Sequence, residues 1–309
     1  MKTIVITGGT GFVGANLARV ALHKNYNVHL LVRDTYKSWR ITDIQKDLHL
    51  HKVSLTDEKQ LITLFKKIRP NWFFHTAVFG AYSAQTDLAE MLQTNILGTT
   101  ALLNAAKSVG FDAFINTGSS SEYGYQDHPT KESDWIDPNS HYAVTKAFTT
   151  QLCRFESLQN KLPITTLRLY SVYGPYEEPA RLMPTLVRAA LQQKLPPLVD
   201  PTIARDYIYI DDVVRAYFIS ATKAKQHFGS VYNVGTGKQT SLRQLVTKIS
   251  KITPINEKPV WRSMEKRMWD TSIWVSNSNL IEKELGWKAK IEVEEGLKKM
   301  LVWQRKNSS

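Results

Sequence analysis

The sequence predicts an α/β fold in which helices cover a doubly wound parallel sheet, with a smaller second region. Apolar segments of strand length alternate with segments of helical periodicity, as expected of successive βαβ units. The first of these strands, Thr3 to Thr7, runs directly into the glycine-rich stretch that ends at Gly14. A strand that enters such a stretch before a helix is typical of a Rossmann-type sheet.

The individual elements follow from apolar runs, helical stripes and stop signals. Seven strands are predicted at 3–7, 27–32, 49–53, 72–76, 113–117, 164–169 and 231–234. Helices are predicted at 14–24, 58–68, 88–109, 142–158 and 211–222. After Gly174-Pro175 the pattern loosens into proline-punctuated segments. We therefore expect a dinucleotide-binding domain of residues 1–174 plus about 211–235, interleaved with a substrate domain of residues 175–210 and 236–309.

Composition places the chain among globular proteins of one or two domains. It has 309 residues, of which 42% are hydrophobic and 22% are charged. Neither a secretion signal nor an uncharged apolar run of membrane-spanning length is visible, so we expect a cytoplasmic protein with no membrane partner. The single cysteine, Cys153, excludes an internal disulfide and a cysteine cluster for zinc, and its helical pattern indicates core packing.

The net charge of +12 favours anionic partners. Lysines and arginines are scattered, and are densest at 258–267 and 288–306. No basic helix, zinc finger or aromatic RNA-binding signature accompanies them. A nucleic-acid partner is therefore not expected, and the charge is read as a nonspecific basic surface that also suits a nucleotide ligand.

The glycine-rich turn is the first candidate binding motif. It fits G-x-G-x-x-G as Gly9, Gly11 and Gly14, and G-x-x-G-x-x-G as Gly8, Gly11 and Gly14. Glycines permit the tight turn and close approach of the backbone to a pyrophosphate, while the following helix N-terminus offers N–H groups to the anion. Both registers predict a dinucleotide site.

The end of the second strand bears on the choice of cofactor. An NAD site usually has an acidic residue there to bind the adenosine ribose, but this sequence has Val32 followed by Arg33. An arginine can pair with a ribose 2′-phosphate, which a carboxylate would repel. NADP(H) is therefore favoured, and NAD(H) stays possible because Asp34 could return a carboxylate to the ribose.

Tyr142 and Lys146 form the candidate catalytic pair. Residues four apart share one face of a helix, so the ammonium can lie beside the phenol. A phenol with a pKa near 10 is a poor acid or base at neutral pH unless a cation stabilises the phenolate. Together with the glycine turn, the pair indicates proton and hydride transfer at an alcohol or ketone carbon.

Six segments occur in an order that resembles the extended short-chain dehydrogenase/reductase family. They are the glycine turn, Thr117-Gly118-Ser119-Ser120-Ser121-Glu122-Tyr123-Gly124, the Tyr142 and Lys146 pair, Arg168 to Pro175, Arg205 to Asp212, and Arg267 to Asp270. This family contains nucleotide-sugar epimerases, dehydratases and 4-keto reductases. The resemblance covers nearly the whole chain.

The resemblance implies roles for further residues. Lys146 would also bind the nicotinamide ribose, and Ser119 would orient the substrate oxygen, with Ser120 and Ser121 as alternatives. Cofactor contacts would come from Gly8, Thr10, Gly11, Phe12, Val13, Gly14, Arg33, Leu55, Ala77, Thr117, Tyr142, Lys146, Tyr170 and Val172. Substrate contacts would come from Ser120, Glu122, Ser171, Arg205, Arg267 and Asp270, with the arginines on the diphosphate. The helices at 88–109 and 142–158 would form a four-helix bundle in a homodimer.

The branch of the family depends on the residues after Ser119. Related 4,6-dehydratases carry an acid and a base, usually Asp-Glu, where this chain has Ser120 and Ser121, although a shortened loop could bring Glu122 to the base position. The Glu122-Tyr123-Gly124 run resembles reductases of the CDP-abequose and CDP-paratose synthase type. We therefore expect NADPH-dependent reduction of a nucleotide-linked 4-keto-6-deoxyhexose or 3,6-dideoxyhexose at C4, in deoxysugar and O-antigen synthesis. A 4-epimerase or 4,6-dehydratase with retained cofactor, or a non-catalytic dinucleotide sensor, are the alternatives.

Two features have structural alternatives. Asp211-Asp212 could suggest a metal, but at a predicted helix start an N-cap is the better interpretation, and no metal is expected. Trp269, Trp274 and Trp287 are expected to be core or base-stacking residues.

Overall fold

The computed structural model describes residues 2–82, 84–255, 257–264, 271 and 273–307, and the chain divides into two compact units. The first comprises Met1–Gly124, Glu132–Leu169 and Val214–Tyr232. The second comprises Tyr125–Lys131, Tyr170–Val213 and Asn233–Ser309. The chain therefore passes between the units several times, and the second unit takes a short segment, 125–131, that no sequence signal separates from the first.

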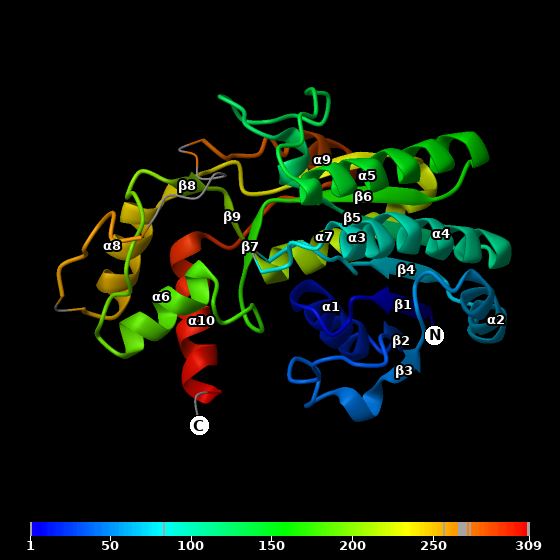
Figure 1. Ribbon diagram of the computed structural model, residues 1–309, viewed down its shortest axis with the longest axis horizontal. Helices are drawn as coiled ribbons and strands as arrows, with labels where there is room; N and C mark the ends of the chain where they lie inside the picture. The colour runs from blue at the N-terminus through cyan, green and yellow to red at the C-terminus, as the bar shows by residue number, and fades with distance from the viewer. Residues whose placement is uncertain (1, 83, 256, 265–270, 272, 308–309) are drawn as a thin grey trace. The chain divides into compact units, whose positions relative to one another are not determined.

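A seven-stranded sheet forms the centre of the first unit (Figure 1). Its order is β10-β6-β5-β4-β1-β2-β3, and the five pairings from β6 to β3 are parallel. The strands are β1 (Thr3–Thr7), β2 (Asn27–Val32), β3 (His49–Lys52), β4 (Trp72–His75), β5 (Ala113–Ser119), β6 (Ile164–Leu169) and β10 (Val231–Val234). This confirms the predicted fold class. β5 continues two residues beyond its predicted end, so that Ser119 is its last residue.

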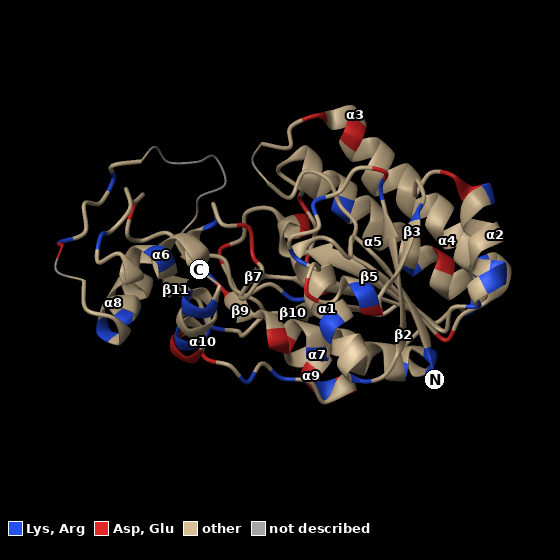
Figure 2. Cartoon of the chain, turned by 90° about the horizontal axis from the view of Figure 1, so that it is seen from below, with Lys and Arg blue, Asp and Glu red and all other residues tan. Residues whose placement is uncertain are grey.

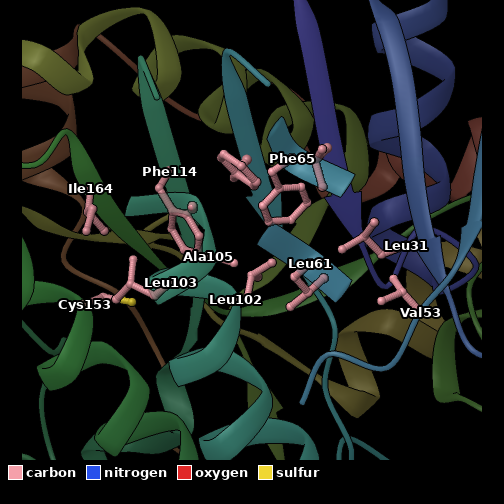
Figure 3. Close-up of a cluster of buried hydrophobic side chains, with 13 residues drawn as sticks. Leu31, Val53, Leu61, Phe65, Leu102, Leu103, Ala105, Phe114, Cys153 and Ile164 are labelled. Atoms are coloured by element: carbon pink, nitrogen blue, oxygen red, sulfur yellow. The ribbon is translucent and has the colours of Figure 1, made fainter. Parts of the chain in front are cut away.

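Helices pack on both faces of this sheet because its strands are apolar on both sides. One face buries a cluster that includes Phe114 of β5, Leu103 of α4 and Cys153 of α5, whose side chains point toward the same core in Figure 3. The expected core position of Cys153 is confirmed. On the other face, Tyr217 and Phe218 of α7 pack edge-on against Phe74 of β4.

Local sequence signals account for several helix starts in the first unit. Its helices are α1 (Phe12–His23), α2 (Glu58–Ile68), α3 (Leu88–Met91), α4 (Gly98–Val109) and α5 (His141–Asn160), with 3-10 turns at η1 (Gln45–Asp47), η3 (Ser120–Tyr123) and η4 (Ala224–Gln226). The Asp57 carboxylate accepts the Gln60 N–H at the start of α2, and the Ser140 hydroxyl accepts the Ala143 N–H at the start of α5.

The predicted helix at 88–109 is interrupted by a π-helical segment, η2 (Leu92–Leu97), between α3 and α4. Its Asn95 side chain is buried and binds the backbone N–H and C=O of Phe79 and the hydroxyl of Thr145 on α5. These long-range bonds, which helical periodicity cannot reveal, hold the widened turn against α5.

The second unit has short strands and helices that the sequence predicts only in part. β7 (Ser171–Tyr173) pairs with β9 (Tyr207–Tyr209) in parallel, and β8 (Ala204–Arg205) pairs with β11 (Thr240–Ser241) in antiparallel fashion. Its helices are α6 (Leu182–Leu191), α8 (Leu242–Ile252), α9 (Asn279–Leu285) and α10 (Val293–Lys306), while α7 (Ile210–Lys223) starts here and continues in the first unit. Pro184 fits within α6 because it lies in the first turn, where its missing N–H has no partner to lose.

The prediction that Asp211-Asp212 caps a helix is wrong, because both residues lie inside α7. α7 already begins at Ile210, so both aspartates lie in its first turn. The Asp212 carboxylate instead accepts the backbone N–H groups of Lys290 and Ile291 at 2.8 and 2.9 Å, and its carbonyl accepts the Trp287 indole N–H. Asp212 therefore anchors the segment before α10, and Trp287 is a core residue, as expected.

Basic residues lie on many elements rather than along one helix (Figure 2). They occur on α2, α8 and α10 among others, interspersed with acidic residues. Within the described ranges, none of the helices has both the length and the apolarity needed to cross a membrane.

Candidate active site

The glycine turn between β1 and α1 is packed too closely for side chains. Gly8 has a φ of +65°, and a Cβ there would lie 2.7 Å from the Ala77 backbone nitrogen. A Cβ on Gly14 would lie 2.3 Å from the Gly8 carbonyl oxygen, which also accepts the Gly11 N–H at 2.8 Å. The turn therefore brings main chain, rather than side chains, to the front of α1.

The start of α1 suits an anionic group. Its N-cap is Gly11, which supplies no side-chain hydrogen bond to the first turn, and that turn contains no acidic residue. The helix is 12 residues long, so its first N–H groups carry the partial positive charge of a helix N-terminus. Thr10, Phe12 and Val13 beside it are half-buried. A pyrophosphate fits this arrangement, which is the role predicted for the turn.

A buried hydrogen-bond network joins the carboxyl ends of β1, β4 and β5. His75 binds the Thr7 hydroxyl through Nδ1 at 2.7 Å and the Thr99 hydroxyl through Nε2 at 2.8 Å. The His75 carbonyl accepts the Thr117 hydroxyl at 2.6 Å, and the Thr7 Oγ1 accepts the Ala77 N–H at 3.1 Å. Burial, and then the charge of Lys146, lower the pKa of His75 to about 3. The neutral imidazole thus supports Ala77 through the Thr7 hydroxyl, and the main chain of His75 binds Thr117; both are predicted cofactor residues.

Tyr142 and Lys146 lie on the first turns of α5, which packs on β5 and η3. Tyr142 is half-buried, and Lys146 is buried with 4% of its surface exposed. Burial lowers the pKa of Lys146, and the negative charge of Glu122 opposes that shift. The helix thus carries a partly accessible phenol one turn from an ammonium group that the protein has taken out of water.

Ser119 ends β5 and caps the short turn η3. Its hydroxyl accepts the Ser121 N–H at 3.2 Å and lies 2.8 Å from the Ser121 hydroxyl. Ser119 and Ser121 are half-buried, whereas Ser120 is buried. Because β5 and α5 pack together, the predicted serine and the tyrosine–lysine helix belong to one region of the first unit.

Glu122 is fully buried, and both of its carboxylate oxygens have partners. Oε1 accepts the Ser119 N–H at 2.8 Å and the Thr150 hydroxyl at 3.0 Å, and Oε2 accepts Arg168 Nε–H at 2.8 Å. This burial does not favour the predicted substrate contacts of Glu122 and Ser120. It also argues against Glu122 as the base of a dehydratase.

Tyr217 and Arg168 have no predicted role, although both belong to the hydrogen-bond network around the candidate site. Tyr217, on α7, binds the Thr117 hydroxyl, and burial raises its pKa, with a smaller contribution from Tyr142. No local motif distinguishes Tyr217 from a core aromatic residue. Arg168 does leave a signal, because a single charged residue in the otherwise uncharged strand Ile164–Leu169 must have a buried partner.

Arg33 immediately follows β2, as predicted. Its side chain is 74% exposed and lies 3.6 Å from the Glu90 carboxylate of α3. Asp34 is also exposed. The exposed position leaves the guanidinium able to reorient, and Glu90 would compete with an anionic ligand for it.

The remaining cofactor and substrate residues lie in several places. In the first unit, Leu55 packs beside Gly98. In the second, Ser171 and Val172 lie on β7, and the buried Tyr170 hydroxyl bonds that of Thr130. Arg205, on β8, binds the carbonyls of Ala204 and Thr271, and its guanidinium lies 5.2 Å from the Trp274 ring centroid. Arg267, Trp269 and Asp270 lie outside the described residues.

The fold and the first unit's residues define a dinucleotide-dependent enzyme of the oxidoreductase type. The chain belongs to the NAD dependent epimerase/dehydratase family, which matches residues 4–235. The resemblance to this broad family is therefore confirmed, whereas the 4-reductase branch has no specific support.

Three relatives illustrate the range of the family. A trifunctional UDP-glucose 4,6-dehydratase, 3,5-epimerase and reductase of Arabidopsis thaliana is 26% identical over 99% of this chain, which spans only 47% of that relative's length. The structure of a UDP-glucose 4-epimerase from Thermotoga maritima, with UDP-glucose, matches with a TM-score of 0.89 at 27% identity, covering 99% of this chain and 100% of the other. MoeE5, solved with UDP-glucose and NAD, matches with a TM-score of 0.87 at 27% identity and the same coverage.

Proposed function

We propose that this protein acts at C4 of a nucleotide-linked hexose, and that its net reaction is 4-epimerisation. The similarity to a UDP-glucose 4-epimerase over the full length of both chains supports this choice. So do the intact Ser119, Tyr142 and Lys146, which a purely regulatory dinucleotide sensor would not need. The proposed reaction is therefore the 4-epimerase alternative from the sequence analysis, and not the net reduction expected there.

The residues have distinct roles in this proposal. Tyr142 takes the proton from the C4 hydroxyl and returns it to the C4 oxygen. Lys146 supports the phenolate by its charge, and Ser119 orients the oxygen. A nicotinamide cofactor, when bound, accepts and returns the hydride. The glycine turn and α1 would hold its pyrophosphate, and Lys146 would hold its ribose.

The pairing of Glu122 with Arg168 supports epimerisation over dehydration in this proposal. Elimination across C5 and C6 needs an acid and a base beside the sugar. Serines stand at the two family positions for these groups, and the neighbouring carboxylate of Glu122 is buried against Arg168. A 4,6-dehydratase activity is therefore not proposed, although such enzymes occur among the relatives.

A 4-keto reductase that uses NADPH is the second candidate, because Arg33 follows β2 where NAD enzymes usually have an acid. Exposed and charged, Arg33 suits a 2′-phosphate. A net reduction would require the cofactor to leave after each turnover, and NADPH supplies reducing equivalents for such a reaction.

We assign most cofactor contacts to the first unit, with Tyr170 and Val172 of the second unit as further ones, and we assign the nucleotide sugar to the second unit. Ser171 and Arg205 are the proposed contacts among the described residues of the second unit. Arg205 would place its planar guanidinium on the diphosphate, exchanging its backbone carbonyl partners for charged oxygens. Arg267 and Asp270 remain proposed contacts on resemblance alone.

A second copy of this chain is the proposed protein partner. α3, η2 and α5 expose large apolar side chains, among them Leu88, Leu92, Leu97, Val144, Phe148 and Phe155. On α5, Val144, Phe148 and Phe155 follow helical spacing on one face, and such a patch is unusual on a monomer. The expected homodimer through these helices would cover it.

The test begins with cofactor retention. Purified protein is dialysed, denatured, and its released nucleotides are identified by mass spectrometry; a 4-epimerase keeps NAD(H), whereas a reductase loses most of its cofactor. The protein is then incubated with UDP-glucose, UDP-galactose or UDP-glucuronic acid, and C4 inversion is followed by proton NMR. Consumption of NADPH with CDP-, dTDP-, UDP- or GDP-linked 4-keto sugars, without C4 inversion of any hexose, would replace the epimerase by the reductase. Inactivity in both assays would refute both.

A further inference from the structure

Glu122 and Arg168 form a buried ion pair behind the Ser119 turn that the proposed chemistry does not use directly. Their side chains are 0% and 3% exposed, and they are joined at 2.8 Å. Replacing a buried ion pair by apolar residues often costs a protein nothing, so its presence is weak evidence for a stabilising role. The contacts of this pair point instead to the neighbouring Ser119 and to α5.

The pair exists because of the register between β5 and β6. Gly118 is paired with Arg168 across these strands. A Cβ on Gly118 would lie 2.8 Å from Glu122 Oε1 and 3.0 Å from Arg168 Cγ, so the missing side chain leaves the space that both charged groups occupy. Glycine in the middle of a strand is otherwise unfavourable, and here it admits the pair.

The carboxylate of Glu122 fixes the conformation of the turn that carries Ser119. The carboxylate accepts the Ser119 N–H, and the Ser119 hydroxyl accepts the Ser121 N–H. Ser119 and Glu122 thus form a capping box at the start of η3. Thr150 of α5 donates to the same carboxylate oxygen. Glu122 thereby ties the serine at the end of β5 to the helix that carries Tyr142.

The guanidinium of Arg168 binds the other end of η3, at Tyr123. Arg168 donates to the Tyr123 hydroxyl at 2.8 Å and lies 4.6 Å from the centre of the Tyr123 ring. Glu122 therefore binds the start of η3 through Ser119, and its partner Arg168 on β6 binds the end of η3 through Tyr123. The hydroxyl of Ser119 has little freedom to rotate away while these bonds persist.

Glu122 also lies close to the turn of α5 that carries Lys146, because Thr150, four residues further along the same helix face, donates to its carboxylate, and its negative charge opposes the lowering of the Lys146 pKa by burial. Of the other described groups that act on this ammonium or are acted on by it, His75 from β4 is neutral because its pKa lies at about 3. Cys153 from α5 is also neutral because burial raises its pKa to about 12. Glu122 from η3 therefore remains as the anion, and its carboxylate is paired with Arg168 from β6. The cluster keeps a surplus positive charge near Tyr142.

We propose that Glu122, held by Arg168, is a positioning residue that sets the orientation of Ser119 and places a negative charge beside the helix turn of Lys146. This inference rests on the proposed chemistry at C4. Because Glu122 is buried, it acts through these two residues and touches neither sugar nor cofactor. Its effect therefore falls on the reacting groups rather than on the affinity for the nucleotide sugar.

The test compares wild type with the double variant Glu122→Gln with Arg168→Gln, which replaces the ion pair by two amides and leaves no unpaired buried charge. We expect kcat for C4 chemistry to fall on the order of 10- to 100-fold, because a small displacement of a catalytic group has that effect, with KM for the nucleotide sugar little changed. The double variant removes one negative and one positive charge together, so the effect of charge is measured in the single variant Glu122→Gln, which keeps Arg168. There the pKa of Lys146 should fall further, and the alkaline limb of the pH profile of kcat should move to lower pH.

Two further single variants distinguish the position of the Glu122 carboxylate from its negative charge. Glu122→Asp keeps the charge but shortens the side chain, so kcat should fall while the alkaline limb stays in place; this also serves if the double variant does not fold. Thr150→Val keeps both the charge and the Ser119 contact and should leave the alkaline limb unchanged. Wild-type kcat in the double variant, a wild-type pH profile in Glu122→Gln, or wild-type kcat in Glu122→Asp would overturn the positioning role. An inactive wild type would instead count against the proposed function.

Discussion

The carbonyl oxygen of Gly8 occupies the position that a side chain on Gly14 would need. The separation would be 2.3 Å, and the conflicting atom is main chain that cannot rotate away. The strand β1 and the helix α1 therefore depend on each other through two glycines six positions apart. This contact also fixes the direction in which the first N–H groups of α1 point.

Gly14→Ala should disrupt the glycine turn. Overpacking of this kind typically costs about 1 to 3 kcal/mol, and we expect a lower Tm together with loss of dinucleotide binding, measured by NADH fluorescence. Gly110→Ala is the control, because a Cβ there meets nothing within 4 Å even though its φ of +74° is strained. It should lower the Tm modestly and leave dinucleotide binding unchanged. Equal binding losses in the two variants would argue against the turn as the pyrophosphate site.

Tyr142→Phe should remove the proton-transfer group while leaving the cofactor site intact. We expect turnover to fall by about 10²- to 10⁴-fold, the usual contribution of a general acid or base, with dinucleotide affinity retained. Lys146→Met should reduce both turnover and affinity, because Lys146 has both roles in the proposal. His141→Gln, at an exposed neighbouring position on α5, is the control and should behave as wild type. Full activity in Tyr142→Phe would remove Tyr142 from the mechanism.

Arg33 and Glu90 should control the preference between the two cofactors. Arg33→Asp should weaken NADPH binding by about tenfold or more and leave NADH binding nearly unchanged, because a charge-assisted bond to the 2′-phosphate is lost. Glu90→Gln should instead strengthen NADPH binding, because it removes the carboxylate that lies 3.6 Å from Arg33. Both affinities are measured by fluorescence titration. Parallel losses for NADH and NADPH in Arg33→Asp would exclude a role in phosphate recognition.

His75 should make the protein sensitive to acid. In the unfolded chain its pKa is about 6.5, and burial lowers it to about 3 in the folded protein. Between these values the unfolded state binds more protons, so the free energy of unfolding decreases as the pH falls through this window and is unaffected above it. His75→Gln should flatten this dependence in urea unfolding measured from neutral pH to pH 4. An unchanged slope would show that other groups dominate acid unfolding.

Phe148→Glu should separate the proposed homodimer into monomers. A charge in the centre of an apolar contact is costly to bury, so the mass measured by light scattering after gel filtration should fall by half. Trp135→Glu changes an even more exposed aromatic residue outside the α5 face and should leave the mass unchanged. A monomeric wild type, or a Phe148→Glu variant that remains dimeric, would contradict this assembly.

The fold could be predicted from the sequence because its signals are local. The centre of β1, Ile4 to Ile6, is apolar and buried, as expected of a strand that helices cover on both faces. The helix that carries Tyr142 was predicted from its helical pattern, and the structure adds the cap at Ser140. The π-helical segment around Asn95 was not predictable, because its cause is a set of bonds to Phe79 and Thr145.

The candidate site was only partly predictable. Glycine spacing and the four-residue separation of Tyr142 and Lys146 are local features, and they indicated the dinucleotide site and the catalytic pair. The position of Glu122 next to Ser121 suggested a substrate contact, but its direction depends on η3 and on β6. The preference for NADPH and for net reduction remains a prediction, and the family relationship supports the broader nicotinamide chemistry.

The sequence by itself determined the alternation of strands and helices, the glycine turn and the tyrosine–lysine pair, because each depends on sterics or periodicity within a few residues. Only the tertiary structure decided which groups the Glu122 carboxylate binds. Its partner Arg168 is 46 positions away, and they meet because the β5–β6 register places Arg168 beside the side-chain-free Gly118. A buried carboxylate must find such a partner, and strand pairing, rather than local sequence, selects it.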